Sequence, residues 1–349
     1  MKRNPAAVHL AVRLEYEQPR LQFPIRLAFA LTINKAQGQS SELRGLDLEM
    51  DCFSNGQSHV ACSRVDKPDN LYIYTEQQKY RLGTKNFNSK PVVWIDAGIH
   101  AREWASIHTA LYFIEQLISE YYSSPKIEQY LKLLDIYIFP CLNPDGYEYT
   151  RTKPHHPSIR LWRKNRRSTN YYKWKNGRKQ YCKGVDLNRN FDFHFAGNTF
   201  VKSHFYIYKA IRDAILRLRK RMKAYMTLHT YSQLWIYPFS NRRRSYSSDI
   251  DDLKAVAKKA VESIKKLYGT KYEYGTGPEV IYAFSGGSSD WVKATAKVKY
   301  SYTIELRPSR SSLDGFILNK RELIPLGRET YEGIKVVINK VIAEAKKKH

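Results

Sequence analysis

Cysteine is scarce in this chain of 349 residues, and its few cysteines are not arranged as metal ligands. The four are Cys52, Cys62, Cys141 and Cys182, and none of them forms a CxxC pair. The pattern therefore argues against a zinc cluster built from cysteine pairs. Four cysteines are also too few to hold a domain of this size together, and they leave the redox compartment open.

Long uncharged apolar runs are missing as well. Residues 1–18 are interrupted by charged side chains, so we expect no signal peptide there. The apolar stretch Leu21–Ile33 contains Arg26 and is too short to span a bilayer. We therefore expect no transmembrane segment and, as the chain is written, no direction to secretion; the compartment itself stays undetermined.

Acidic residues are outnumbered, because Lys and Arg total 59 against 33 for Asp and Glu, a net charge of +26. Such a balance is typical of proteins with an anionic partner, such as nucleic acid or a membrane surface. Basic residues scattered over a solvated surface explain it equally well. The hydrophobic content of 42% allows a sizeable core in one large domain or two modest ones.

The polar segment 77–91, with its glycine and proline, predicts a junction. We place this junction at residues 81–91, between an N-terminal part, residues 1–80, and a large domain, residues 92–349. In the large domain, apolar runs alternate with helical patterns. We expect strands at residues 92–96, 136–139, 225–228, 234–237 and 300–304, and helices at residues 103–122, 205–222, 249–268 and 326–345. This order predicts an α/β fold with a mixed, mostly parallel sheet and helices on both faces.

Three residues could together bind a metal. His100 and Glu103 follow the first strand directly, and His229 follows a later one. Ligands at strand ends can meet at one edge of such a sheet. Two imidazoles and one carboxylate leave a fourth tetrahedral position open, as catalytic zinc requires. Taken singly, the His-x-x-Glu pair could be an exposed polar turn and His229 a hydrogen-bonded structural residue.

A second carboxylate, Glu305, stands at the end of an otherwise apolar and aromatic strand. Its burial costs free energy unless the group is paired or functional. It could be a general base beside the metal, or it could form a salt bridge with Arg307. Polar loops offer Arg163 for an oxyanion, and Asn188 with Arg189 for a carboxylate, although arginines are common in so basic a chain.

In order and context, seven segments resemble the zinc metallocarboxypeptidases of the pancreatic carboxypeptidase A and B type, over roughly residues 84–349. The segments are GIHAREW (98–104), NPDGYEYT (143–150), RLWRKNR (160–166), GVDLNRNF (184–191), LHTYSQLWIYP (228–238), IYAFSGGSSDW (281–291) and YTIELRP (302–308). The resemblance implies a carboxypeptidase-like fold, one Zn²⁺ ion and the removal of single residues from peptide or protein C-termini.

The resemblance also implies roles for single residues. The zinc ligands are expected to be His100, Glu103 and His229. Glu305 is expected to be the general base that takes a proton from water and passes it to the leaving amine, and Arg163 to stabilise the oxyanion.

Other matching positions are expected to bind the substrate or to orient a ligand. Asn188, Arg189 and Tyr282 match the group that holds the terminal carboxylate of the substrate, and Arg102 matches a contact further along it. Asp186 is placed to orient a metal-binding histidine.

Ser289 falls at the position that selects the side chain removed. It is neither acidic nor apolar, and its expected neighbours Ile236, Ile281 and Thr303 lean apolar, which favours neutral side chains.

The chain departs from this family in three places. The opening helix and first strands that normally precede the segment at Lys85 are missing, so we expect an N-terminally truncated domain. The segment between Phe191 and His229 is short and lacks a cysteine partner for Cys182, which we expect to be a free thiol. Residues 169–181 are longer than expected, basic and aromatic.

The first 80 residues resemble the C-terminal end of a superfamily-one DNA helicase of the transposon-encoded type. The resemblance rests on residues 23–40 and 55–74, in which Gln37 and Arg64 match nucleotide-contacting positions. The phosphate-binding GxxxxGK[ST] loop is absent, so we do not expect ATP hydrolysis. We expect a small α/β helicase-derived segment joined to a monomeric peptidase. The alternatives are an inactive or peptide-binding remnant of the same fold, and nucleic-acid binding through residues 1–80.

Overall fold

The computed structural model describes residues 12–13, 44–46, 71–75, 78–81, 90–168, 172–194 and 206–347. The chain divides into two compact units, Met1–Lys90 and Pro91–His349. The first unit contains β1 (Val12–Arg13) and a small sheet in which β2 (Arg44–Leu46) runs parallel to β3 (Leu71–Thr75), and β3 pairs antiparallel with β4 (Gln78–Arg81). Gln37 and Arg64 lie outside the described residues.

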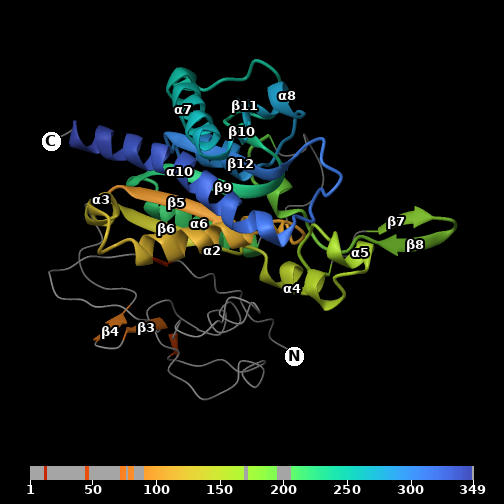
Figure 1. The fold of residues 1–349 in the computed structure, drawn as a ribbon. Helices are drawn as coiled ribbons and strands as arrows, with labels where there is room; N and C mark the ends of the chain where they lie inside the picture. Colours follow the sequence, from red (N-terminus) through yellow and green to blue (C-terminus); the bar gives the residue numbers. More distant parts are fainter. Residues whose placement is uncertain are drawn as a thin grey trace. The chain divides into compact units, whose positions relative to one another are not determined.

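A mixed sheet forms the centre of the second unit (Figure 1). Its strands lie in the order β6 (Asp135–Phe139), β5 (Val92–Ala97), β9 (Met222–Ser232), β12 (Tyr300–Ser309), β10 (Leu234–Ile236) and β11 (Glu273–Gly275). The first four are parallel to one another, and only β10 with β12 pairs antiparallel. Every residue of β5 and β6 is buried, as a strand covered on both faces requires. The predicted mostly parallel α/β sheet is therefore confirmed.

Helices cover both faces of this sheet, as the contacts of β12 demonstrate. The Tyr302 hydroxyl donates to the carbonyl of Leu253 in α7 (Ile250–Tyr268), whereas Ser301 donates to the carbonyl of Ser289 in α9 (Ser288–Ala294). Because successive side chains of a strand point to opposite faces, α7 and α9 pack on opposite sides. On the α7 side lie α10 (Leu323–Lys346) and α2 (Trp104–Ser119), which pack against each other.

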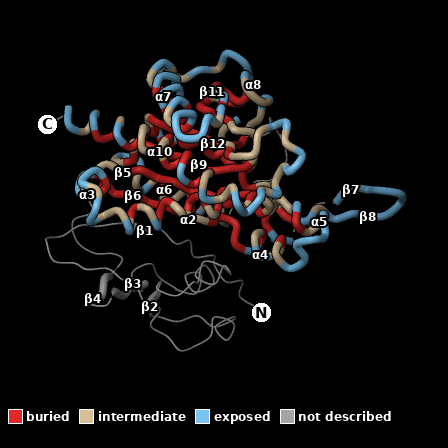
Figure 2. The backbone as a smooth tube through the Cα atoms, viewed as in Figure 1, coloured by how far each residue is buried: buried red, intermediate tan, exposed pale blue. Residues whose placement is uncertain are grey.

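The helices form where apolar residues recur with helical spacing. Leu253, Val256, Ala257, Ala260 and Ile264 are all buried on one stripe of α7, and Gly269 ends the helix in the left-handed conformation, φ +73°. Figure 2 places buried residues along the strands and the inner helix faces, with exposed residues on the outer turns.

Several boundaries differ from the sequence predictions. β9 continues to Ser232 and β12 to Ser309, so His229 and Glu305 lie within strands rather than at their ends. The parallel pairing of the two strands continues past this point and keeps both in the sheet. The helix predicted at residues 205–222 is α6 (Tyr206–Leu218), and Met222 already begins β9.

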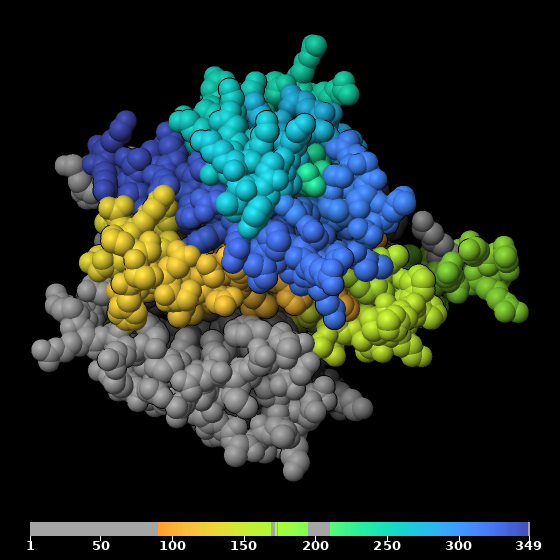
Figure 3. Space-filling view, viewed as in Figure 1, coloured from red at the N-terminus to blue at the C-terminus, as the bar shows by residue number. Residues whose placement is uncertain are grey.

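Shorter elements between the strands were not predicted. They are α3 (Pro125–Leu133), α4 (Pro144–Thr152), α5 (Pro157–Arg160), β7 (Tyr172–Lys175), β8 (Arg178–Tyr181), η4 (Leu187–Arg189), α8 (Gly277–Val280) and η5 (Lys320–Glu322). The β7–β8 hairpin extends from the body of the unit, and its side chains stand out in the space-filling view (Figures 1 and 3). No helix in the part of the chain that the structure describes has the length and apolarity needed to span a membrane.

Candidate metal centre and active site

The loop that follows β5 carries His100 and Glu103, and it places them at the end of the sheet where β5 terminates. It turns at Gly98, whose φ is +63° and where an added Cβ would lie 2.7 Å from Cγ1 of Ile107, so only glycine fits. The Asn143 side chain donates to the carbonyl of Ile99 at 3.2 Å and holds the loop in place. Glu103 is the N-cap of α2 but makes no capping bond with its side chain, which is directed elsewhere.

The three predicted ligands converge on one buried point. Glu103 Oε1 lies 2.8 Å from Nδ1 of His100, and Glu103 Oε2 lies 2.9 Å from Nδ1 of His229. The two Nδ1 atoms are 3.1 Å apart. One ligand atom from each residue lies within 4.8 Å of the others, and all three side chains are buried.

These residues fit a zinc ion. Nitrogen and oxygen ligands about 2.0–2.2 Å from a tetrahedral zinc lie roughly 3.4 Å from one another, close to the observed spacing. Glu103 is also ionised, as a ligand must be. Burial alone would raise its pKa, but the adjacent His100 and His229 hold that pKa well below its ordinary value.

A ring of polar groups fixes the orientation of both imidazoles. His100 Nε2 lies 3.2 Å from Asp186 Oδ1, and Arg163 Nε donates to Oδ2 of the same carboxylate at 2.8 Å. His229 Nε2 lies 3.3 Å from the hydroxyl of Thr227 and 3.3 Å from Nδ2 of Asn188. When Nδ1 binds a metal, Nε2 carries the proton, so the Thr227 oxygen is the acceptor and the Asn188 amide nitrogen is not.

A buried carboxylate, Asp96, lies behind Thr227. It stands beside Thr227 in the β5–β9 register and accepts from Trp94 Nε1 at 2.8 Å. Burial raises the pKa of Asp96, and the nearby hydroxyl of Thr227 opposes the rise most among its neighbours. Oδ1 of Asp96 has no partner at hydrogen-bonding distance among the described residues. Neither Thr227 nor Asp96 was predicted, although Thr227 precedes His229 by two residues and so shares its face of the strand.

Glu305 lies directly opposite His229 in the β9–β12 register. Burial raises its pKa to about 7; His229 opposes the rise and the negative charge of Glu103 adds to it. Within the described ranges its Oε2 atom is buried and has no hydrogen-bond partner. The alternative of a salt bridge to Arg307 is wrong, because Arg307 pairs with Glu322 and Glu329 instead.

Arg163 also lies beside the predicted metal ligands, with NH1 3.8 Å from Glu103 Oε1. About a quarter of its side chain is exposed. Arg102 lies at the edge, where it stacks over the Phe316 ring at 3.8 Å and donates to the carbonyl of Leu161 at 3.4 Å.

The predicted carboxylate-binding residues come together beside the metal ligands. Arg189 NH2 donates to the Tyr282 hydroxyl at 3.1 Å, and Arg189 NH1 to the carbonyl of Asn188 at 2.8 Å. The Asn188 side-chain oxygen accepts from the backbone N–H of Ser288 at 2.8 Å. Gly286, with φ +72°, approaches the backbone of Arg189 too closely for any Cβ. Tyr282 is 52% exposed, so the end of this cluster faces solvent.

Ser289 is buried beneath the same loop. Its hydroxyl lies 2.9 Å from the hydroxyl of Thr303, beside the buried Ile236. The next residue, Asp290, accepts from the backbone N–H of Ser240 at 2.8 Å, so its carboxylate is already engaged away from Ser289.

Comparisons with known proteins agree with this geometry. The profile of a family described as zinc carboxypeptidase matches residues 65–333. Carboxypeptidase B of Astacus astacus is 39% identical over 74% of this chain and 83% of that protein. Carboxypeptidase A2 of Mus musculus is 37% identical over 72% of this chain but only 59% of that protein.

Solved structures of similar proteins agree with this geometry as well. Bovine thrombin-activatable fibrinolysis inhibitor, in complex with tick carboxypeptidase inhibitor, is 34% identical with a TM-score of 0.64, over 73% of this chain and 83% of that one. Carboxypeptidase A of Helicoverpa armigera is 30% identical with a TM-score of 0.63, over 74% of this chain and 62% of that one.

Proposed function

The chain belongs to the zinc carboxypeptidase family, zinc-dependent hydrolases of C-terminal peptide bonds, and from this premise we propose which residues carry the reaction. The supporting observation is the convergence of two buried imidazoles and the Glu103 carboxylate on one point, with Glu305 opposite His229 on the next strand. This arrangement would combine a metal site with a second carboxylate outside the ligand set, as metal-assisted hydrolysis requires.

Zinc binding is assigned to His100, Glu103 and His229. A zinc ion held there supplies a Lewis acid that polarises a carbonyl group and favours the ionised form of water near neutral pH. Asp186 accepts the Nε2 proton of His100, and Thr227 accepts that of His229, so that each ring presents Nδ1.

The substrate enters with its C-terminal carboxylate first. Arg189 supplies a forked cation, Tyr282 a hydroxyl and Asn188 an amide, which together recognise a carboxylate. A clamp fixed beside the metal ligands brings only the last peptide bond to the reacting centre, which explains release of single residues. Arg102, at the outer edge, contacts residues further along the peptide.

Glu305 acts as the general base. Its buried, unpartnered oxygen can take a proton from the attacking water and return it to the leaving amine. Arg163, with NH1 3.8 Å from Glu103 Oε1, stabilises the negative charge that develops on the carbonyl oxygen.

The pocket beneath the clamp favours neutral side chains. Ser289, Thr303 and Ile236 contribute hydroxyl and methyl groups but no charge. A preference for Lys or Arg needs an exposed carboxylate, and Asp290 is buried and bound to Ser240. Hydrolysis of benzoyl-Gly-Phe at a higher rate than benzoyl-Gly-Arg would support this preference.

The decisive experiment compares the purified full chain with Glu305→Gln. We expect both to hold one zinc per chain by elemental analysis, and the variant to lose about 10²–10⁴-fold in kcat on benzoyl-Gly-Phe, because the base is gone and the ligands remain. Glu148→Gln, on the exposed surface of α4, is the matched control and should turn over normally. Unchanged turnover in Glu305→Gln refutes the assigned base, and zinc without any hydrolysis by the natural sequence identifies a peptide-binding remnant.

A second proposal concerns residues 1–80 and the domain limits 81–91 and 92–349. We propose that residues 1–80 derive from a helicase and bind nucleic acid, on the support of the helicase-like segments at residues 23–40 and 55–74. The logarithm of the full chain's affinity for single-stranded DNA should then fall linearly with the logarithm of the salt concentration, and a chain starting at residue 81 should bind more weakly. We also expect a monomer, which sedimentation measures directly.

A further inference from the structure

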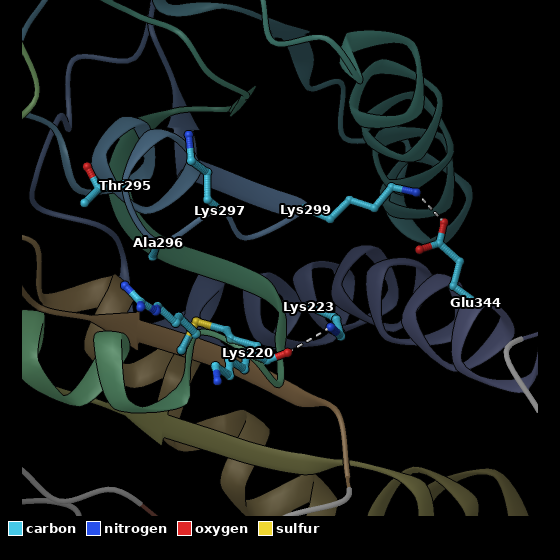
Figure 4. A pocket seen from close by; sticks show the side chains of 9 residues that line it. Lys220, Lys223, Thr295, Ala296, Lys297, Lys299 and Glu344 are labelled. Carbon is cyan, nitrogen blue, oxygen red and sulfur yellow. Dashed lines mark hydrogen bonds and ion pairs between the residues drawn. The ribbon is translucent and has the colours of Figure 1, made fainter.

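A hollow of about 380 Å³ lies at the end of the sheet opposite to the metal centre (Figure 4). It opens between the start of β9, at Met222, and the turn before β12, at residues 295–299. Seven residues separate Met222 from His229 along β9, which places the hollow roughly 23 Å from the metal ligands. Its lining residues are Arg219, Lys220, Met222, Lys223, Thr295, Ala296, Lys297, Lys299 and Glu344.

Cations dominate this lining, because five of its nine residues are Lys or Arg and only one is acidic. The acid, Glu344, is already compensated by the protein. It accepts from Lys299 Nζ at 2.8 Å, from the Tyr300 hydroxyl at 2.6 Å and lies 3.3 Å from Lys340 Nζ. Lys299 is itself neutralised by Glu344 and by Asp252 at 2.7 Å, so the positive charge of the lining comes from Arg219, Lys220, Lys223 and Lys297.

The backbone brings these cations together from separate elements. Arg219 and Lys220 follow α6, and Lys223 donates from Nζ to the carbonyl of Lys220 at 3.1 Å, which fixes that turn. On the other side, Lys297 adopts a φ of +59°, a left-handed conformation that is costly for a residue with a Cβ.

We propose that this hollow binds a multiply charged oxyanion, namely linked phosphate groups. Its volume lies within the range of roughly 300–1,000 Å³ usual for ligand sites. Lysines recognise phosphate as point charges, and several around one hollow neutralise adjacent phosphates together. Because the site is remote from the metal ligands, occupancy leaves peptide cleavage unchanged.

Titration calorimetry of the full chain with inorganic tripolyphosphate tests this site. We expect binding to the natural sequence, and about 10-fold weaker binding or more by Lys220→Glu/Lys297→Glu, since reversed charges repel the ligand. Both side chains are exposed, so the change should not disturb folding. The matched control, Lys126→Glu/Lys153→Glu, alters the net charge equally at exposed positions outside the lining and should keep its affinity within about twofold.

Two results overturn the proposal. The first is no binding of tripolyphosphate by the natural sequence. The second is equal weakening of binding in the two double variants, because the effect then depends only on the net charge of the protein. A parallel titration with long-chain inorganic polyphosphate distinguishes the source of the phosphates. If polyphosphate and tripolyphosphate bind with equal affinity per site, the ligand is a small free phosphate compound. Binding at least about 10-fold tighter, and lost in the same variant, identifies a polymer that extends beyond the hollow.

Discussion

Replacing Thr227 with valine tests how the buried surroundings of the metal centre hold His229. The substitution keeps the shape of the side chain but removes the hydroxyl oxygen 3.3 Å from Nε2. Thr227 and His229 are 0% and 1% exposed, so solvent does not reach the lost contact. The imidazole would then carry a buried N–H without its acceptor whenever Nδ1 binds zinc.

The expected loss is large enough to measure. An unsatisfied buried donor costs about 1–3 kcal/mol. Loss of a group that orients a metal ligand lowers metal affinity by roughly 10–100-fold, which corresponds to about 1.4–2.7 kcal/mol. We therefore expect Thr227→Val to bind zinc about 10–100-fold more weakly than the natural sequence, with the ligands unchanged.

Competition with a chelating dye measures the zinc dissociation constant directly and does not depend on catalysis. Thr227→Ser is the matched control, because it keeps the hydroxyl and loses only a methyl group. We expect the serine variant to retain the natural affinity within about threefold, since the acceptor remains. Equal zinc affinity of the valine variant and the natural sequence would refute the assigned hydrogen bond, and so would equal weakening by valine and serine.

Three further substitutions test other parts of the site. Ser289→Asp should raise kcat/KM for benzoyl-Gly-Arg relative to benzoyl-Gly-Phe by about 10–150-fold, because a charge-assisted pair contributes roughly 1.5–3 kcal/mol. Arg189→Ala should lower kcat/KM on free C-termini by a similar factor and leave zinc content unchanged. Burial raises the pKa of Asp290 to about 7, so the folded protein retains a proton that the unfolded chain loses. The free energy of unfolding should therefore fall by up to about 4 kcal/mol from pH 4 to pH 7 and then level off. In Asp290→Asn the fall measured by urea titrations should be smaller by this amount than in the natural sequence.

The sequence contains enough information to predict the architecture and the candidate site. Apolar runs such as residues 92–96 and 136–139 have the length and composition of buried strands, and the structure has strands there. The residues proposed as ligands were predicted from the order of short motifs, and the structure brings His100, Glu103 and His229 together.

Other features depend on contacts that no local pattern contains. The full lengths of β9 and β12 follow from their mutual pairing, which local apolarity does not express. Asp96 lies beside Thr227 only because β5 and β9, which are distant in sequence, pair in the sheet. The basic hollow likewise combines the end of α6, the turn at residues 295–299 and α10, and each of them alone resembles an ordinary solvated surface.

The position of Glu305 opposite His229 has a consequence for how this protein loses activity on heating. The two residues occupy paired positions on neighbouring parallel strands, so hydrogen bonds of the main chain set their separation. Fraying of peripheral loops leaves that separation intact, whereas melting of the central strands destroys it. On heating, the spacing between Glu305 and His229 should therefore be lost only together with the folded core.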